Sequence, residues 1–251
     1  MNIFVLMKRT FDTEEQIVVK DEQVDESGAE FIINPYDEYA IEEAILQRDE
    51  HGGEVTVVTV GDEEAEKELR TALAMGADKG VLIDREEIEE LDQAGIALIL
   101  STYLSEQEYD LILCGNVAVD GGSGQVGPRV AERLGIAQVT TATAITINGS
   151  QVTIRRDVEG DEEEVEVSLP VLITAQQGLN DPRYPSLPGI MKAKKKPLEV
   201  IDLDDLDLDE EDFELKTRNV EVFLPPKKES GEMIDGEPAE QVKTLIAALK
   251  I

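Results

Sequence analysis

One stretch of the 251-residue chain decides its fold, and it reads Asp110-Leu-Ile-Leu-Cys-Gly-Asn-Val-Ala-Val-Asp-Gly-Gly-Ser-Gly-Gln-Val-Gly127. The residues up to Cys114 form a short apolar run, which is typical of a buried strand. A glycine-rich turn follows and enters a helix that ends near Gly135. A buried strand, a turn and a helix in succession are the building unit of α/β proteins with a parallel sheet.

The same alternation of strand and helix patterns precedes this stretch. Asn34 and Pro35 open a helix, with Asn34 placed to cap it and Pro35 in its first turn. The expected strands are 3–7, 54–60 and 80–83, and the expected helices are 34–52, 62–75 and 92–104. The chain is therefore predicted to form a doubly wound, mostly parallel α/β sheet.

The rhythm changes after Ile136, where antiparallel strands are expected. The turn Asn148-Gly149 lies between two alternating segments, a strong hairpin signal. The elements expected here are hairpin strands at 144–147 and 151–156, an antiparallel strand at 163–167 and a core strand at 171–174.

The last fifty residues have a different character. Residues 202–212 are too acidic to be core, and 239–250 form an amphipathic helix pattern. Segments with little core of their own usually lie on a partner. We expect an α/β domain over 1–200, which includes an irregular loop at 176–197, and an extended C-terminal arm over 201–251.

Composition restricts the class of protein. Apolar residues make up 41% of the chain, enough for a core, and no apolar run approaches the roughly 18 residues of a spanning helix. The single cysteine, Cys114, fits a reducing compartment, so we expect a cytosolic protein. A net charge of −33 argues against nucleic-acid binding. It indicates either a dispersed solvating surface or an acidic docking face, and the spread of acids along the chain favours the first.

The glycine-rich turn is the best candidate for a ligand site. Glycines let the backbone approach a ligand, and free N–H groups at a helix start attract anions. The spacing matches neither a P-loop nor the Gly-x-Gly-x-x-Gly fingerprint. From the residues alone, a phosphate cradle and a tight turn without a ligand remain equally good interpretations. If a ligand binds, the ends of the strands at Leu6, Met7 and Cys114 are expected to flank its crevice.

Residues for catalysis or metal binding are scarce in this sequence. The chain has one histidine, His51, at a helix end, and one cysteine, and its carboxylates show no metal-loop spacing. We therefore predict neither a catalytic set nor a metal site.

A second region of interest is the loop at 176–197. Three prolines fix an irregular path around Leu187. A helix beginning near Leu187 to Gly189 is expected to carry the four lysines of the run Lys192-Ala-Lys-Lys-Lys196. An apolar tip with basic neighbours on a rigid loop suits a partner-binding anchor. A loop packed on its own domain is the alternative, and the pattern does not separate the two.

Six segments carry a family resemblance. The chain resembles the β subunits of electron-transfer flavoproteins between about Asn2 and Glu199, with the loop motif the most specific part. The segments are Val5-Leu-Met-Lys-Arg9, Asn34-Pro-Tyr-Asp37 with Ala40-Ile-Glu-Glu-Ala44, Arg70-Thr-Ala-Leu-Ala-Met-Gly-Ala-Asp78, Asp120 to Pro128, Asp157 to Pro170, and Leu179-Asn-Asp-Pro-Arg-Tyr-Pro-Ser-Leu-Pro-Gly-Ile-Met-Lys-Ala-Lys-Lys-Lys196.

The resemblance implies a fold similar to the adenine-nucleotide α-hydrolases and an αβ heterodimer. One redox-active FAD is held mostly by the α subunit, and the arm contacts that subunit. A structural AMP lies in the β subunit, with Gly124 to Gly127 facing its phosphate. The nucleotide contacts implied are Leu6, Asn34, Pro35, Tyr36, Asp37, Val60, Ala118, Val119, Asp120, Gly121, Gly122, Ser123, Gly124, Gln125, Val126, Gly127, Pro128 and Arg129.

For the loop, the resemblance implies recognition of acyl-CoA dehydrogenases, with Leu187 as the anchor. The complex then delivers electrons from fatty-acid oxidation to a membrane quinone oxidoreductase, as a carrier and not as an enzyme by itself. The partner contacts implied are Arg183, Tyr184, Leu187, Pro188, Ile190, Met191, Lys192 and Lys195.

Two alternatives stay open. Gln125-Val-Gly-Pro128 looks closer to family members that bifurcate electrons with NADH as donor, whose β subunit binds a second FAD in place of AMP. Those members typically have Asp-Thr where this chain has Gly122-Ser123, so AMP is the favoured expectation. A free-standing adenine-nucleotide sensor is the third hypothesis, which needs neither the arm nor the Leu187 loop.

Overall fold

A nine-stranded, mostly parallel sheet forms the centre of the computed structural model, which describes residues 1–85, 88, 90–228, 230–231 and 233–249. This confirms the predicted α/β class. In spatial order the strands are β11 (Asp161–Ser168), β10 (Gln151–Val158), β9 (Ala137–Asn148), β12 (Val171–Ala175), β8 (Leu111–Gly115), β1 (Asn2–Leu6), β6 (Glu54–Gly61), β7 (Lys79–Asp84) and β13 (Leu198–Ile201).

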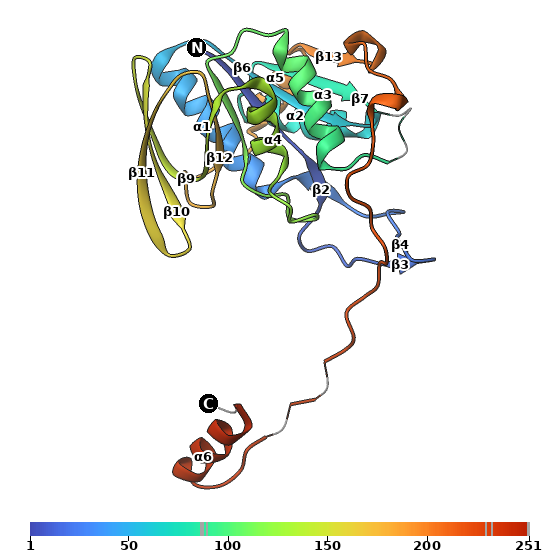
Figure 1. Ribbon diagram of the computed structural model, residues 1–251, viewed down its shortest axis with the longest axis vertical. Helices are drawn as coiled ribbons and strands as arrows, with labels where there is room; N and C mark the ends of the chain where they lie inside the picture. The colour runs from blue at the N-terminus through green and yellow to red at the C-terminus, as the bar shows by residue number, and fades with distance from the viewer. Residues whose placement is uncertain (86–87, 89, 229, 232, 250–251) are drawn as a thin grey trace. The chain divides into compact units, whose positions relative to one another are not determined.

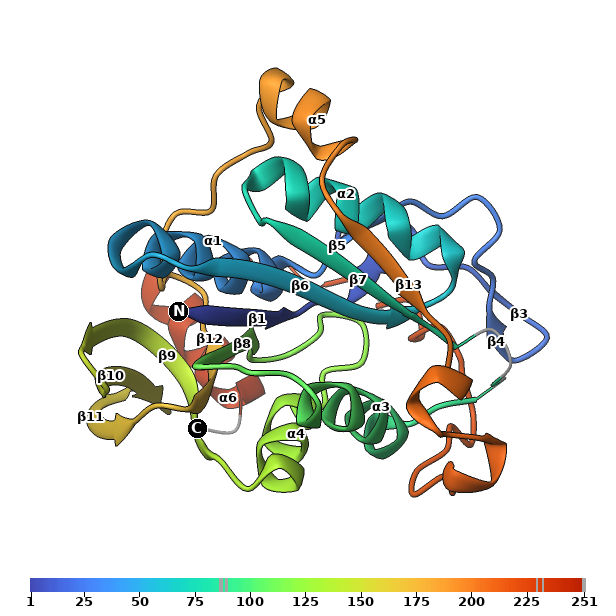
Figure 2. The ribbon, with the colours of Figure 1, turned by 90° about the horizontal axis from the view of Figure 1, so that it is seen from above.

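The helices cover both faces of this sheet (Figure 2). One face carries the first two helices and the other carries the next two, as expected for a doubly wound arrangement. They are α1 (Pro35–His51) and α2 (Glu66–Met75), preceded by the 3₁₀ turn η1 (Glu63–Ala65), then α3 (Gln93–Ser105) and α4 (Val126–Leu134). The short α5 (Leu187–Ala193) packs on α2 (Figure 2).

Strand order reverses between β1 and β8. β1 pairs in parallel with β6 on one side and with β8 on the other. The chain runs from β1 outward through β6 and β7, then returns to β8 on the other side of β1. Such a reversal leaves a crevice beyond the carboxyl ends of the two strands.

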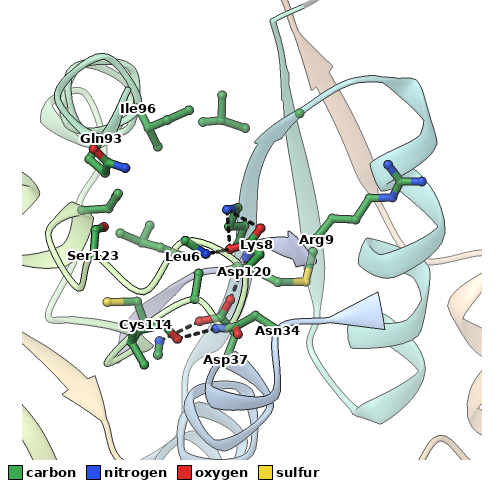
Figure 3. Close-up of a pocket in the computed structure, with 18 of the residues that line it drawn as sticks. Leu6, Lys8, Arg9, Asn34, Asp37, Gln93, Ile96, Cys114, Asp120 and Ser123 are labelled. Carbon is green, nitrogen blue, oxygen red and sulfur yellow. Dashed lines mark hydrogen bonds and ion pairs between the residues drawn. The ribbon is translucent and has the colours of Figure 1, made fainter. Parts of the chain in front are cut away.

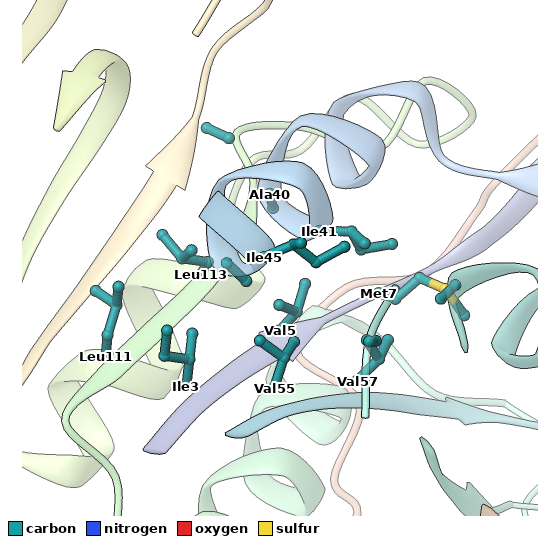
Figure 4. Close-up of a cluster of buried hydrophobic side chains, with 14 of the residues drawn as sticks. Ile3, Val5, Met7, Ala40, Ile41, Ile45, Val55, Val57, Leu111 and Leu113 are labelled. Carbon is teal, nitrogen blue, oxygen red and sulfur yellow. The ribbon is translucent and has the colours of Figure 1, made fainter. Parts of the chain in front are cut away.

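Helix α1 is buried along most of its length. Ile41 and Ile45 are fully buried and, in Figure 4, lie over the strand residues Val5 and Leu113. The helix also buries polar residues, and those residues have hydrogen-bonding roles described below.

The antiparallel part of the sheet matches the predicted hairpin. β9 and β10 meet at the Asn148-Gly149 turn, and β11 adds a third antiparallel strand. β11 forms one edge of the sheet, and its first four residues, Asp161 to Glu164, are exposed.

One expectation about the acidic segment was wrong. Residues 202–212 were expected to stay out of the core, yet Leu203 and Leu208 are buried and pack in the cluster that contains α3. The 3₁₀ turns η2 (Asp204–Leu206) and η3 (Glu210–Asp212) bend the segment. Its leucines therefore turn inward while acids such as Asp204 stay exposed. β13, which pairs in parallel with β7, was not predicted from the sequence.

The chain divides into two units. The main unit contains 1–17 and 26–220, with the small pair β2 (Arg9–Phe11) and β5 (Phe31–Ile33). The second unit contains 18–25 and 221–251, with the hairpin β3 (Val19–Lys20) and β4 (Gln23–Val24) and the terminal helix α6 (Pro238–Leu249) (Figure 1). The predicted terminal helix is present, although Lys250 lies outside the described residues.

Within the described part of the chain, no helix combines the length and apolar character needed to cross a membrane.

The packing of α1 predicts a sharp difference between two of its residues. Ile41→Ala should lower the free energy of unfolding by about 2–5 kcal/mol, because truncation of this fully buried side chain leaves a cavity in the core. Leu46→Ala, on the same helix but 41% exposed, should cost less than about 1 kcal/mol. Chemical denaturation measures both, and equal losses would contradict the assigned face of α1.

Candidate functional site

A cavity of about 410 Å³ opens at the switch point of the sheet (Figure 3). It lies beyond the carboxyl ends of β1, β6, β7 and β8 and is bounded by α3 and the glycine-rich turn before α4. Leu6, Met7 and Cys114, the strand ends named from the sequence, line it. The volume falls within the range of about 300–1,000 Å³ that small-molecule sites occupy.

The carboxylate of Asp37 joins the two strands that flank the crevice. Asp37 is 4% exposed and accepts hydrogen bonds from the backbone N–H of Lys8 and of Gly115, both at 2.7 Å. Lys8 follows β1, and Gly115 ends β8. A side chain at Gly115 would put its Cβ 2.5 Å from Oδ1 of Asp37, so glycine is what permits this approach.

Burial raises the pKa of Asp37 from 3.8 to about 7, although the hydrogen bonds from Lys8, Gly115 and Asn34 and the charge of Lys8 act in the lowering direction. The group therefore titrates near neutral pH inside the wall of the cavity.

Asn34 has a different role from the predicted one. It occupies the N-cap position of α1, but its side chain reaches across to the glycine-rich turn instead of capping the helix. Nδ2 donates to the carbonyl oxygen of Val117 at 3.0 Å, and Oδ1 accepts from the N–H of Val119 at 3.2 Å. The capping prediction was wrong because two backbone groups of a neighbouring loop compete for the same amide.

The start of α4 lines the cavity through Gln125, Val126 and Gly127. The N-cap residue is Gln125, whose side-chain oxygen accepts from Arg129 at 2.9 Å and not from the first turn of the helix. N–H groups in a first helical turn lack intrahelical partners and attract anions. A Cβ at Gly127 would lie 2.7 Å from Sγ of Cys114, so this glycine lets the helix start approach the end of β8.

Two of the cations that line the cavity have acidic partners. Lys8 pairs with Asp120 at 2.7 Å, and Figure 3 shows the two joined across the turn. Arg9 lies 3.7 Å above the ring of Phe31 and pairs with Glu64 at 2.6 Å. A third cation, Arg85, also lines the cavity, and its Nη1 donates to the carbonyl oxygen of Ile88 at 3.4 Å. Arg85 and the backbone N–H groups at the start of α4 are therefore both available to an anion in this cavity.

Cys114 contributes an unreactive thiol to the wall of the cavity. Burial, together with the nearby charge of Asp37, raises the pKa of its thiol well above the usual range. The thiol stays protonated and acts as a small apolar group. Among the described residues, no cluster of three or more His, Cys, Asp or Glu side chains could hold a metal ion.

Most residues named from the sequence for nucleotide binding line the cavity. These are Leu6, Asn34, Asp37, Val60, Ala118, Asp120, Gly121, Ser123, Gly124, Gln125, Val126 and Gly127. The cavity lining does not include Pro35, Tyr36, Val119, Gly122, Pro128 and Arg129.

Sequence reasoning missed one side of the cavity. Lys8 and Arg9 follow directly after the first strand, a position that could have identified them. Gln93 and Ile96 come from α3, and they reach the cavity only through the tertiary fold, so no local signal marks them.

The loop at 176–197 lies outside this cavity and exposes apolar side chains. Tyr184, Leu187 and Met191 are 93%, 80% and 74% exposed, and Pro188, Lys192 and Lys195 are also exposed. The helix predicted near Leu187 is present, but it ends at Ala193. Of the lysine run, only Lys192 is therefore helical.

Fold and cavity together define a doubly wound α/β protein with a crevice at its switch point. A family model described as "Electron transfer flavoprotein domain" matches residues 21–206. The chain belongs to the electron transfer flavoprotein family, among its β subunits.

Several curated proteins are similar over nearly their whole length. Electron transfer flavoprotein subunit beta of Bacillus subtilis is 64% identical, over 100% of this chain and 98% of that protein. The human electron transfer flavoprotein subunit beta is 34% identical, over 100% of this chain and 97% of that protein. Acryloyl-CoA reductase electron transfer subunit gamma of Anaerotignum propionicum is 38% identical, over 99% of this chain and 98% of that protein.

The raised pKa of Asp37 predicts a pH dependence of stability. Because the folded chain binds this proton more tightly than the unfolded chain, the free energy of unfolding should fall as pH rises from about 4 through about 7. Asp37→Asn cannot titrate. The difference in unfolding free energy, wild type minus variant, should therefore decrease across that window. Chemical denaturation over a pH series measures it, and a constant difference would contradict the assignment.

Proposed function

We propose that this chain is the β subunit of a heterodimeric electron carrier. The complex takes electrons from acyl-CoA and related dehydrogenases and passes them through FAD to a membrane quinone oxidoreductase. The observation that carries the proposal is that one unit combines a switch-point cavity with a separate loop of exposed apolar residues. A carrier needs both a nucleotide site and a surface that its partners can read.

The cavity suits AMP, with the phosphate at the start of α4 between Gly124 and Gly127. The free N–H groups there and the close approach allowed by Gly127 support this placement. Leu6 and Val60 offer apolar wall for an adenine ring, and Ser123 offers a hydroxyl. In this role AMP is structural, because it ties the glycine-rich turn to the strand ends.

FAD, when bound to the heterodimer, supplies one- and two-electron redox chemistry. The contribution of this chain is to shape the environment and select partners. The α subunit would hold most of the flavin. The part of the arm that belongs to the second unit, from Glu221 onward, would contact that subunit. The exposed apolar face of α6, formed by Val242, Leu245, Ile246 and Leu249, supports such a contact.

A second candidate is the β subunit of a bifurcating complex, in which a second FAD replaces AMP. Gln125-Val-Gly-Pro128 favours it, and so does the extent of the cavity, which continues past Arg9 and Phe31 to Gln93 on α3. A relative named caffeyl-CoA reductase-Etf complex subunit CarD, from Acetobacterium woodii, is 36% identical to this chain.

Nucleotide content should separate the two candidates. The heterodimer, co-expressed with its α subunit and denatured, should release one FAD and one AMP. Gly127→Ala should reduce the AMP several-fold, because its Cβ collides with Cys114 and shifts the start of α4. Gly80→Ala is the matched control, since its Cβ would make ordinary contacts at 3.6 Å with Leu73 and Leu198. Release of two FAD and no AMP would overturn the carrier function and support the bifurcating one.

The docking role predicts a kinetic defect for Leu187→Ala. This variant should slow reduction of the heterodimer by an acyl-CoA dehydrogenase by about tenfold or more, since an 80% exposed anchor is lost, and its flavin content should stay complete. Val200→Ala, which truncates a 54% exposed residue on β13, is the control. Equal reduction rates for Leu187→Ala and wild type would remove the anchor role.

A further inference from the structure

The loop that exposes Leu187 is held at both ends by hydrogen bonds with α1 and α2. On the N-terminal side, Arg183 forms a two-pronged ion pair with Glu42 of α1. Nε of Arg183 lies 2.7 Å from Oε2 of Glu42, and Nη2 lies 2.8 Å from Oε1. The backbone N–H of Arg183 also donates to Oε2 at 3.1 Å. Three hydrogen bonds therefore fix both the side chain and the backbone of one loop residue.

The neighbouring acid, Glu43, holds a second loop residue. Nδ2 of Asn180 donates to Oε2 of Glu43 and to the carbonyl oxygen of Tyr39, both at 3.0 Å. Nε2 of Gln47 donates to the other oxygen of Glu43 at 2.7 Å. Burial raises the pKa of Glu43, with Glu42 acting in the same direction. Two adjacent buried carboxylates are costly unless hydrogen bonds compensate them, and here the compensating groups come largely from the loop.

On the C-terminal side, α2 and the lysine run hold each other. Nη1 of Arg70 donates to the carbonyl oxygens of Ala193 at 3.1 Å and Lys196 at 3.0 Å. Nζ of Lys196 donates to the carbonyl oxygens of Leu73 at 2.9 Å and of Ala77 at 2.5 Å, near the end of α2. Lys196 is therefore a structural group, whereas the other lysines of the run are exposed.

Between the two ends, α5 rests directly on α2. A Cβ at Gly189 would lie 2.5 Å from the carbonyl oxygen of Ala74, so the two backbones are in close contact. The side-chain oxygen of Ser186 accepts from the N–H of Gly189 at 3.1 Å and caps α5. The apolar tip is thus carried on a segment whose backbone is fixed before any partner arrives.

We infer that Glu42 is a positioning residue for partner docking. Its carboxylate acts through Arg183 to hold the loop in the conformation that presents Leu187. A preorganised loop saves the ordering entropy that a flexible one loses on binding. The partner that fits is a protein with an apolar pocket beside an acidic rim, because Leu187 and Met191 stand next to exposed Lys192 and Lys195 in a chain of net charge −33. This inference rests on the proposed function.

The test is Glu42→Gln in the complete heterodimer, with an acyl-CoA dehydrogenase as donor. The KM for the dehydrogenase should rise about tenfold, which corresponds to the ordering cost of roughly one residue. The rate at saturating dehydrogenase should change much less. Without any partner, trypsin should cut after Arg183 faster than in wild type, because the loop opens more often.

Three variants make the test specific. Glu50→Gln makes the same change on the same helix, at an exposed residue, and should leave KM unchanged. Glu42→Asp keeps a carboxylate and should recover part of the loss. Arg183→Lys keeps the charge but loses the two-pronged geometry. Because Arg183 is 39% exposed, this variant should fold normally and still raise KM.

The outcomes separate the inference from the function on which it rests. A higher KM in Glu42→Gln, Arg183→Lys and Leu187→Ala supports the inference. If Leu187→Ala raises KM while Glu42→Gln and Arg183→Lys do not, docking stands and the positioning role is overturned. If Leu187→Ala leaves KM unchanged, the proposed docking function is overturned and the inference with it.

Discussion

The arrangement of the site depends on one buried carboxylate. Parallel strands that diverge at a switch point leave backbone N–H groups at their ends without sheet partners, and such groups are costly when buried. Asp37 satisfies one N–H from each of the two central strands. Asp37 therefore ties the chain beyond β1 and the end of β8 to the first turn of α1, and Gly115 is required so that this side chain can reach.

Helix α1 connects three functions of the fold through successive turns. Asp37 in its first turn holds the strand ends, Ile41 and Ile45 pack on the sheet, and Glu42 and Glu43 hold the loop. Because α1 is buried in the core, one helix holds both the strand ends beside the cavity and the loop that exposes Leu187. The buried acids of α1 accept hydrogen bonds from other segments, which explains why they occur among its apolar residues.

The sequence predicted the order and type of most elements because each strand is a short apolar run and each helix has clear boundaries. It also predicted a crevice at the ends of the strands now labelled β1 and β8, since switch points follow from strand order. It failed where tertiary contacts overrode local preference. Asn34 binds a distant loop instead of capping its helix, and Leu203 and Leu208 are buried although acids surround them. The α3 side of the cavity had no local signal because its residues meet the others only in the folded chain.

The acidic edge strand β11 has a consequence for the behaviour of the protein in concentrated solution. An edge strand offers unpaired backbone groups to any other strand, and exposed charge is one way to discourage such pairing. Four consecutive exposed acids, Asp161 to Glu164, place this charge at the start of the edge. The protection is electrostatic, so it weakens when salt screens these charges. The barrier to strand pairing at this edge therefore depends on the ionic strength of the solution.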